Sequence, residues 1–478
     1  MKMVKSLLLG AAAGLVGVAG AQAADLPVKA KPVQYVKICS LYGAGFYYMP
    51  GTDTCLKVGG FVRAEVNVNA GGSFSVAATG DFDSNSRAGL DDWRSRAGVT
   101  LDARSQTEYG TLRSYMVIAS TSDNSQSGSP NGGAGIGAGN PNGSGRNPYT
   151  RLWSNAAFIQ FAGFTAGKTG SFFDFDLQPY SNQTNYWGSN LAGGGIEVFA
   201  YTAQFGNGLS ASISAENPNG HRSNILSAPN GAALASGNTG LNAVGTWQYG
   251  NQQAPDVVGN LRIDQAWGSA QIMGAYHQLT ANSLNASNGV EMEGSGWAFG
   301  AGAKFNLPML GKTDYVQAQA TWSEGAVMYV GSGVNGGFAL TDNNTVAGAV
   351  GSSNFVGQQA DAVVANNGLD KTKGWSITGG YEHFWNTQWK TSLYGAYGKL
   401  EYSDASSNVL RPATAAAGSS ASWSFWQVGS RTVWTPVTNL DLSVEVMYNS
   451  QQTAFTGPTI GDNSWWSGMF RAQRNFYP

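Results

Sequence analysis

The sequence has little charge and few residues suited to metal binding or acid–base catalysis. Asp, Glu, Lys and Arg make up 12% of its 478 residues, about half the share usual in soluble domains. It has three histidines, His221, His277 and His383, and they are scattered along the chain. None lies in a G-x-S-x-G motif or at the spacing of metal ligands. We therefore expect no cofactor, no metal site and no catalytic residue.

Long apolar runs are also missing beyond the first residues. No later stretch approaches the 18 apolar residues of a transmembrane helix, which excludes a membrane protein built from helices. The single apolar run, at 7–20, follows Lys2 and Lys5 and precedes the small residues Ala21 and Ala23. This arrangement is typical of a secretory signal peptide, and we predict that residues 1–23 are removed after Ala23.

Cysteine is scarce as well. Cys39 and Cys55 lie close together, before the first predicted strand. Two thiols without a neighbouring histidine make a poor metal site, whereas an exported chain enters an oxidising compartment. We predict a disulfide between Cys39 and Cys55 in a periplasmic N-terminal segment, residues 24–55.

What the chain does have, from residue 56 to its end, is a repeated unit. Runs of about ten residues alternate apolar and polar side chains, and the connections between them alternate between short and long. The mean hydropathy of −0.20 agrees with such interleaving. The pattern predicts an all-β fold over residues 56–478: a transmembrane antiparallel β-barrel of about sixteen strands, with long external loops and short periplasmic turns.

Both ends of this barrel are expected on the periplasmic side of an outer membrane. Aromatic residues near strand ends, Trp93, Trp153, Trp322, Trp434 and Trp465, suit the two bilayer interfaces. The sixteen strands are predicted at 56–69, 93–104, 110–121, 151–162, 163–171, 196–205, 209–216, 255–266, 268–280, 295–307, 313–324, 374–385, 388–402, 422–435, 439–451 and 464–476.

Two stretches resemble a known family. Residues 31–63, KPVQYVKICSLYGAGFYYMPGTDTCLKVGGFVR, are similar to the N-terminal signature of the alphaproteobacterial general porins, the rhizobial and Brucella type, and residues 469–476, MFRAQRNF, to their closing strand. The resemblance implies an outer-membrane general diffusion porin, passive toward small hydrophilic solutes and ions. It also implies a homotrimer whose pores are narrowed by the third external loop. Tyr477 and Pro478 depart from the terminal Phe common in such barrels.

The third long connection, 172–195, is aromatic and acidic where the others are rich in Gly and Ser. We expect it to fold into the pore and to present Asp174 and Asp176. Opposite charge would then give a transverse field that biases ion passage. The predicted basic wall comprises Arg63, Arg94, Arg96 and Arg113. Any of these arginines could instead pair with Glu65 or Asp102 as scaffolding of the lumen.

Outer-membrane lipid, lipopolysaccharide and two identical subunits are the expected partners, and the net charge of −2 gives no basic footprint for nucleic acid. Three other functions stay open. A substrate-selective channel, for a sugar or an organic anion, could use Tyr180, Tyr186 and Trp187 as aromatic lining. A β-barrel enzyme could place His221 at the external rim. A structural or adhesive protein would have a plugged lumen.

Overall fold

The computed structural model describes most of the chain after its first residues. The described residues are 37–68, 91–123, 149–182, 187–188, 195–226, 247–250, 253–283, 291–331, 339–341, 355–411, 416–452, 454 and 462–476. The predicted signal peptide lies outside them, so that prediction stays untested, and Tyr477 and Pro478 lie outside them as well.

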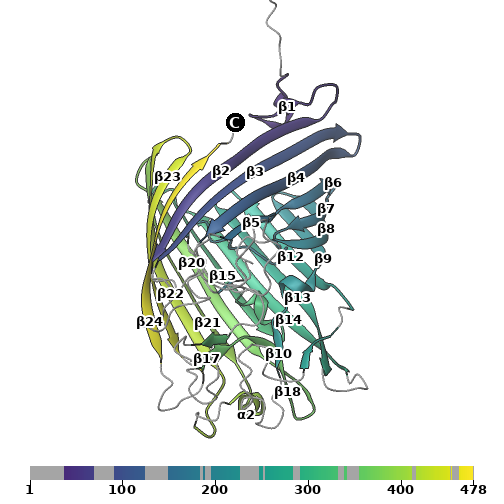
Figure 1. Cartoon of the computed structure of the whole chain (residues 1–478). Helices are drawn as coiled ribbons and strands as arrows, with labels where there is room; N and C mark the ends of the chain where they lie inside the picture. The colour runs from purple at the N-terminus through teal and green to yellow at the C-terminus, as the bar shows by residue number, and fades with distance from the viewer. Residues whose placement is uncertain are drawn as a thin grey trace, which may run out of the picture.

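Sixteen antiparallel strands of the described residues form a closed ring, because β24 pairs with β2 (Figure 1). This confirms the predicted barrel. In chain order the ring comprises β2 (Cys55–Val68), β3 (Asp91–Thr107), β4 (Gly110–Asp123), β5 (Tyr149–Trp153) continued by β6 (Ala157–Phe161), β7 (Phe164–Thr169), β8 (Ile196–Gly206), β9 (Leu209–Glu216), β12 (Asp256–Gln265), β13 (Gly268–Ser283), β14 (Glu291–Asn306), β15 (Tyr315–Glu324), β20 (Lys373–Phe384), β21 (Trp389–Glu401), β22 (Trp423–Val437), β23 (Leu440–Gln452) and β24 (Asn463–Asn475).

The strands expose apolar side chains on the outer face and bury polar side chains on the inner face, which is the reverse of a soluble protein. On β23, Val444 and Val446 are 56% and 46% exposed on the outer face, whereas Ser443 and Glu445 are 4% and 1% exposed on the inner face. Successive side chains of a strand point to opposite faces, so alternation in sequence becomes an apolar exterior and a polar lumen.

Short turns lie at the end of the barrel that carries the described ends of the chain, and the long connections lie at the other end (Figure 1). The turn between β8 and β9 shows why the short ones need particular residues. Asn207 and Gly208 both have positive φ, 50° and 75°. A Cβ on Gly208 would lie 1.9 Å from the carbonyl oxygen of Asp264, so only glycine fits there.

The long connections carry small elements of their own, and part of them packs together. Leu226, Val330, Leu410 and Trp423 belong to one buried apolar cluster over the outer end of β20–β24. Among the described residues, no helix has the length and apolar character needed to cross a bilayer. The elements in these connections are η2 (Pro218–Gly220), β10 (Asn224–Leu226), β11 (Trp247–Tyr249), η5 (Val327–Tyr329), β16 (Ala339–Thr341), β17 (Phe355–Gln358), β18 (Ala360–Ala365), β19 (Gly368–Lys371) and α2 (Asp404–Leu410).

Of the tryptophans expected at the interfaces, Trp93, Trp322 and Trp434 are exposed on the outer face. Trp465 is not: it is buried against Phe425, and its neighbour Trp466 is the exposed residue. Adjacent residues of a strand point to opposite faces, so only one of these two tryptophans can face the membrane. The prediction that Trp465 lies at the bilayer interface was wrong, and Trp466 takes that position.

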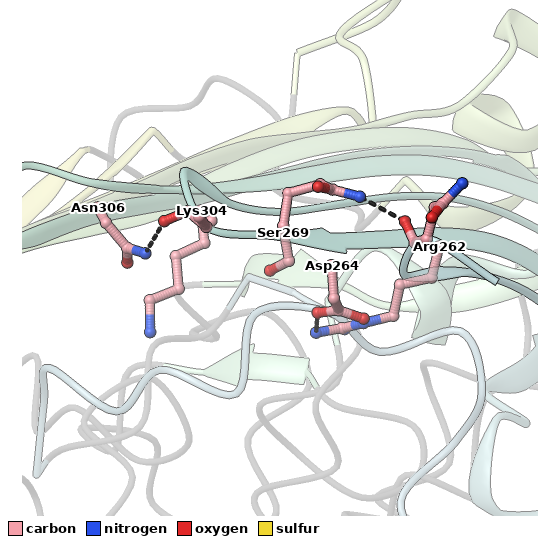
Figure 2. A pocket seen from close by; sticks show the side chains of 9 residues that line it. Arg262, Asp264, Ser269, Lys304 and Asn306 are labelled. Carbon is pink, nitrogen blue, oxygen red and sulfur yellow. Dashed lines mark hydrogen bonds and ion pairs between the residues drawn. The ribbon is translucent and has the colours of Figure 1, made fainter.

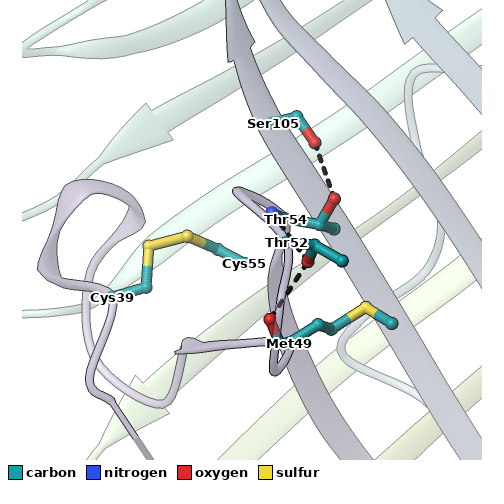
Figure 3. Close-up of a disulfide and its surroundings, with 6 residues drawn as sticks. All are labelled: Cys39, Met49, Thr52, Thr54, Cys55 and Ser105. Carbon is teal, nitrogen blue, oxygen red and sulfur yellow. Dashed lines mark hydrogen bonds between the residues drawn. A yellow bond between two sulfur atoms is a disulfide. The ribbon is translucent and has the colours of Figure 1, made fainter.

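The predicted disulfide is present. Cys39 and Cys55 are bonded and fully buried, and they join the N-terminal segment to the first residue of β2 (Figure 3). This segment contains η1 (Ser40–Tyr42) and β1 (Tyr47–Tyr48), which pairs with β2. The guanidinium of Arg104 lies over the ring of Phe46, 5.0 Å from its centroid, so the segment rests on the lumen side of β3.

Replacing both cysteines by serine should loosen this segment without opening the barrel, because the bond closes a loop outside the ring of strands. The loop-entropy effect of such a closure is about 3 kcal/mol. We expect chymotrypsin to cut the C39S/C55S variant within 39–55 while the folded barrel keeps its heat-dependent shift on an SDS gel. Unchanged resistance to chymotrypsin would show that η1 and β1 hold the segment without the bond.

Candidate functional site

The connection from β7 to β8 runs through the interior of the barrel. We call its residues 170–195 the lumen segment; the structure describes 170–182, 187–188 and 195 of it. The backbone N–H groups of Phe175 and Asp176 both donate to Oε1 of Gln319 on β15, at 3.0 and 2.9 Å. Since β15 is six strands further along the ring than β7, the lumen segment reaches the opposite wall.

Three aromatic side chains of the lumen segment rest on glycines of that wall. Any Cβ at these glycines would lie within 2.6 Å of an aromatic carbon, so a larger residue would push the segment away. Glycine here allows a close approach of backbone and ring. The pairs are Phe175 with Gly302 of β14 (2.3 Å), Tyr180 with Gly380 of β20 (2.6 Å) and Trp187 with Gly398 of β21 (2.4 Å).

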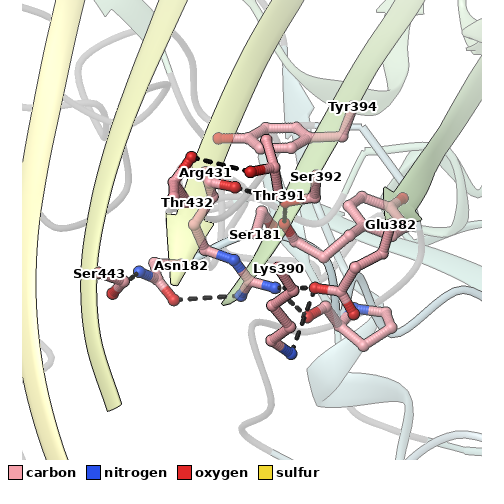
Figure 4. Close-up of polar contacts among 12 residues, drawn as sticks. Ser181, Asn182, Glu382, Lys390, Thr391, Ser392, Tyr394, Arg431, Thr432 and Ser443 are labelled. Atoms are coloured by element: carbon pink, nitrogen blue, oxygen red, sulfur yellow. Dashed lines mark hydrogen bonds and ion pairs between the residues drawn. The ribbon is translucent and has the colours of Figure 1, made fainter. Parts of the chain in front are cut away.

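Asn182 fastens the segment to three more strands, and Figure 4 shows its contacts with Ser443 and Arg431. Its backbone N–H donates to the Glu445 carboxylate at 3.0 Å, and its Nδ2 donates to Ser443 Oγ at 2.8 Å. Its side-chain oxygen accepts from Arg431 Nη1 at 3.2 Å and from Arg471 Nη1 at 2.8 Å. One residue thus bridges β22, β23 and β24.

Arg431 also holds the lumen segment at Pro179, three residues before Asn182. Its Nη2 donates to the carbonyl oxygen of Pro179 at 2.9 Å and lies 2.7 Å from Glu382 Oε1. Lys390 Nζ is 3.3 Å from the same carboxylate oxygen (Figure 4). Charge-assisted bonds of this kind are about twice as strong as neutral ones, so this corner of the wall is a rigid support.

The predicted basic wall adjoins these supports, because β24 pairs with β23 on one side and with β2 on the other. Arg63, Arg94 and Arg471 surround the buried Glu65, with N–O distances of 3.6, 2.5 and 2.5 Å. Sequence reasoning missed Arg471, whose strand closes the barrel only in three dimensions. Its signal was present in the motif MFRAQRNF, where Arg471 shares the inward parity of β24.

The remaining predicted arginines extend this group along β3 and β4. Arg113 and Arg104 both bind the Asp102 carboxylate, at 3.0 and 2.7 Å. Arg96 lies over the Trp153 ring, 5.5 Å from its centroid. The basic arc is the name used below for Arg63, Arg94, Arg96, Arg104, Arg113 and Arg471 together with Glu65 and Asp102.

The two predicted loop acids have different surroundings. Asp176 is buried and accepts bonds from Tyr180 Oη and from Gln317 Nε2, the latter at 2.9 Å. Asp176 therefore stabilises the conformation of the lumen segment and its contact with β15. Asp174 is only partly buried. That these acids and the predicted arginines face each other across a constriction stays a prediction.

The residues considered for other functions are mostly occupied. Tyr180 and Trp187 are buried anchors, and Tyr186 lies outside the described residues. His383 contacts Asp314 at 2.6 Å beside a short turn. His221 lies in an external connection as expected, but it is fully buried and has no exposed rim position.

A polar pocket of about 730 Å³ adjoins the lumen segment on the side of the short turns (Figure 2). Arg262 links the two, because its guanidinium is 5.3 Å from the Phe175 ring centroid and 2.8 Å from Asp264. Within the described residues no group of three or more His, Cys, Asp or Glu side chains could hold a metal ion. The lining residues are Asn207, Arg262, Asp264, Gln265, Ala266, Gly268, Ser269, Lys304 and Asn306.

Comparison with known proteins gives a consistent result. The family model described as a porin subfamily matches residues 25–471. Porin Omp2a of Brucella melitensis is 31% identical over 385 residues, which cover 76% of this chain and 96% of that protein. Porin Omp2b of Brucella neotomae is 28% identical over 398 residues with the same coverage.

One solved structure carries the fold comparison. The outer membrane channel DcaP of Acinetobacter baumannii superposes with a TM-score of 0.56 at 16% identity, over 90% of this chain and 99% of that one. At this identity the likeness concerns the fold alone.

Replacing Asn182 by alanine should loosen the lumen segment, because the partners of its side chain on β22, β23 and β24 lose a buried contact. Each lost bond to a charged group costs about 1.5–3 kcal/mol. We expect noisier single-channel currents and faster entry of larger sugars in a liposome-swelling assay. In the matched variant S181A, the lost hydroxyl bonds only within the segment, and both readouts should stay at wild-type values. Wild-type behaviour of N182A would show that the contacts of the three aromatic rings with the wall glycines are enough to hold the lumen segment.

Proposed function

The chain belongs to the porin subfamily, and from this premise we propose that its basic arc and lumen segment together form an anion-preferring constriction. The protein is an integral channel of the outer membrane through which small hydrophilic solutes and ions diffuse passively. The proposal adds which ions pass more readily and which residues act on them.

The composition of the basic arc carries the proposal. The basic arc has six arginines, which lie on the lumenal face of β2, β3, β4 and β24. Its two carboxylates, Glu65 and Asp102, neutralise part of their charge. Arg63 and Arg113 keep 20% and 27% of their side chains exposed, so lumenal ions reach them. Charge lining a narrow aqueous path raises the local concentration of counter-ions.

The neighbouring wall of β20–β23 supports the same assignment. There Arg431 and Lys390 are balanced by Glu382 and Glu445 around Asn182, and Asp176 is bound within the lumen segment. The excess positive charge is therefore concentrated at the basic arc.

We also propose a homotrimer. Its subunits meet where the barrel wall has its short strands, β7 and β9, and we call this part of the wall, with β8 between them, the low wall. The strands β7 and β9 have 6 and 8 residues, whereas a tilted strand needs about 9–11 residues to cross the hydrocarbon layer. The outer face here is apolar, because Phe164 of β7 and Phe199 of the intervening strand β8 are exposed. A neighbouring copy would cover this low wall; lipid and lipopolysaccharide would cover the taller strands.

The N-terminal assignments follow from export to the outer membrane. Residues 1–23 serve as the signal peptide in this proposal. The disulfide-bonded segment before β2 lies on the side of the short turns, which is the periplasmic side in the predicted orientation. An oxidising periplasm favours the bond between Cys39 and Cys55.

Anion preference is testable by reversal potentials in a potassium chloride gradient across a planar bilayer. Wild-type channels should favour chloride, and less so as salt screens the arginines. The R63Q/R96Q variant should lower the chloride-to-potassium permeability ratio by about twofold per charge, equivalent to ~0.4 kcal/mol each. The control R474Q removes an arginine from the same part of the barrel, but position 474 has the outward parity of β24, so its ratio should not change. Potassium preference in the wild type would overturn the proposal.

Subunit contact at the low wall predicts different effects for two outward phenylalanines. Phe199 lies on β8 beside β7 and β9, and Phe299 lies on the longer β14. Truncation in a packed interface leaves a void, whereas lipid fills the space on a lipid face. F199A should lower the temperature at which a trimer dissociates on a semi-native gel, and F299A should leave it unchanged. Equal effects, or a monomer in the wild type by native mass spectrometry, would contradict this interface.

A further inference from the structure

A buried group of acids and histidines lies at the outer end of β12 and β13, apart from the basic arc. Asp256 begins β12 and His277 lies on β13, and both are fully buried. His277 Nδ1 is 2.7 Å from Asp256 Oδ1. Burying a carboxylate and an imidazole together costs desolvation energy, and keeping them in a channel wall calls for a reason beyond stability.

The long connections supply the other partners of this pair. Tyr329 of η5 donates its hydroxyl to Asp256 Oδ2 at 2.8 Å. Asp361 of β18 accepts from the backbone N–H of Val327 at 2.8 Å and of Ser223 at 2.7 Å. The connection after β9 and the connection after β15 are therefore joined to each other and to the wall through two carboxylates.

The η5 turn in turn holds the lumen segment at two places. The ring of Tyr329 packs on that of Phe173 with centroids 4.8 Å apart. The N–H of Gly188 donates to the carbonyl oxygen of Val330 at 2.8 Å. Both contacts lie within four residues of Val327, so a movement of η5 would change the support of the lumen segment near its start and near Trp187.

His221 is the member of this group suited to respond to acid. Its ring stacks on Tyr329 at a centroid distance of 4.0 Å, and its Nδ1 is 3.9 Å from Asp256 Oδ2. Within the described part of the chain, neither ring nitrogen has a hydrogen-bond partner. Burial lowers the pKa of His221 to about 4, because the imidazolium would lose its hydration there.

We propose that Asp256, His277, Tyr329 and His221 form an acid-sensitive lock, in which protonation of His221 releases η5 and loosens the lumen segment. The inference rests on the proposed role of that segment in narrowing the channel. In the released state the imidazole meets water and titrates near its ordinary pKa, so a proton binds more favourably there. Falling pH therefore shifts the equilibrium toward release.

The sign of the effect depends on the other charges around the lock. The His221 contribution to the packed state is complete above pH 6.5 and falls as pH drops toward 4, a shift of up to roughly 300-fold in the equilibrium. Asp361 opposes it, since burial raises the pKa of that carboxyl and a proton on it suits the packed state. The further titratable or charged groups that face the lock are Asp174, Glu216, Arg222, Tyr249 and Tyr402.

Single-channel recordings of the full-length protein at pH 7.5 and pH 4.5 test the lock. Wild-type channels should leave the fully open state at least about tenfold more often at the lower pH. In H221F the ring still stacks on Tyr329 but cannot be protonated, so this increase should disappear or reverse. H383Q removes a histidine outside the lock and should respond as the wild type does. Y329F loses the bond to Asp256 and should show frequent transitions already at pH 7.5.

Hydrogen–deuterium exchange of residues 326–331, corrected for the intrinsic effect of pH, gives a second readout. Acid should increase exchange there in the wild type and not in H221F. An acid response that persists in H221F, or that H383Q removes equally, would overturn the proposal, and so would exchange that does not depend on pH. Conductance and ion preference at pH 7.5 report on the channel itself, so failure of the lock is distinguishable from failure of the proposed function.

Discussion

The close fit of three aromatic rings on three wall glycines is the contact on which the lumen depends. A connection of this length would lose much conformational entropy on ordering, at about 1–2 kcal/mol per residue for the backbone alone. Phe175, Tyr180 and Trp187 offset that cost by burying large apolar surfaces in an otherwise polar interior. Once they are seated, water is excluded, and the bonds of Asp176 and Asn182 form where they are strongest.

The same connection also shapes the outside of the barrel. The chain leaves β7 after six residues and turns into the lumen, so the wall at this point is too low for a strand that faces lipid throughout. The path of this one connection thereby links the narrowing of the pore to the proposed subunit contact. A longer β7 would give a taller wall, but it would also start the lumen segment further from the glycines it needs.

Alternation along the chain was sufficient to predict the strands, because lipid and water impose a period of two on each of them. The predicted strand at 209–216 coincides with β9, and the predicted parity placed Arg63 and Arg94 in the lumen. The same reasoning could not find Gly302 or Asn182. Their roles depend on contacts between residues more than a hundred positions apart, and no local pattern carries that information.

For the arginines too, the sequence pattern predicts one property and the three-dimensional structure determines another. Their inward orientation follows from the cost of charge on the lipid face, whereas their partners follow from the closure of the ring. Arg471 binds Glu65 within the basic arc and also binds Asn182 in the lumen segment. The electrostatic wall and the loop that faces it therefore share a side chain. In the proposed constriction, a change at Arg471 would alter both the charge of the passage and the position of the lumen segment, so we expect pore size and ion preference to change together at this residue.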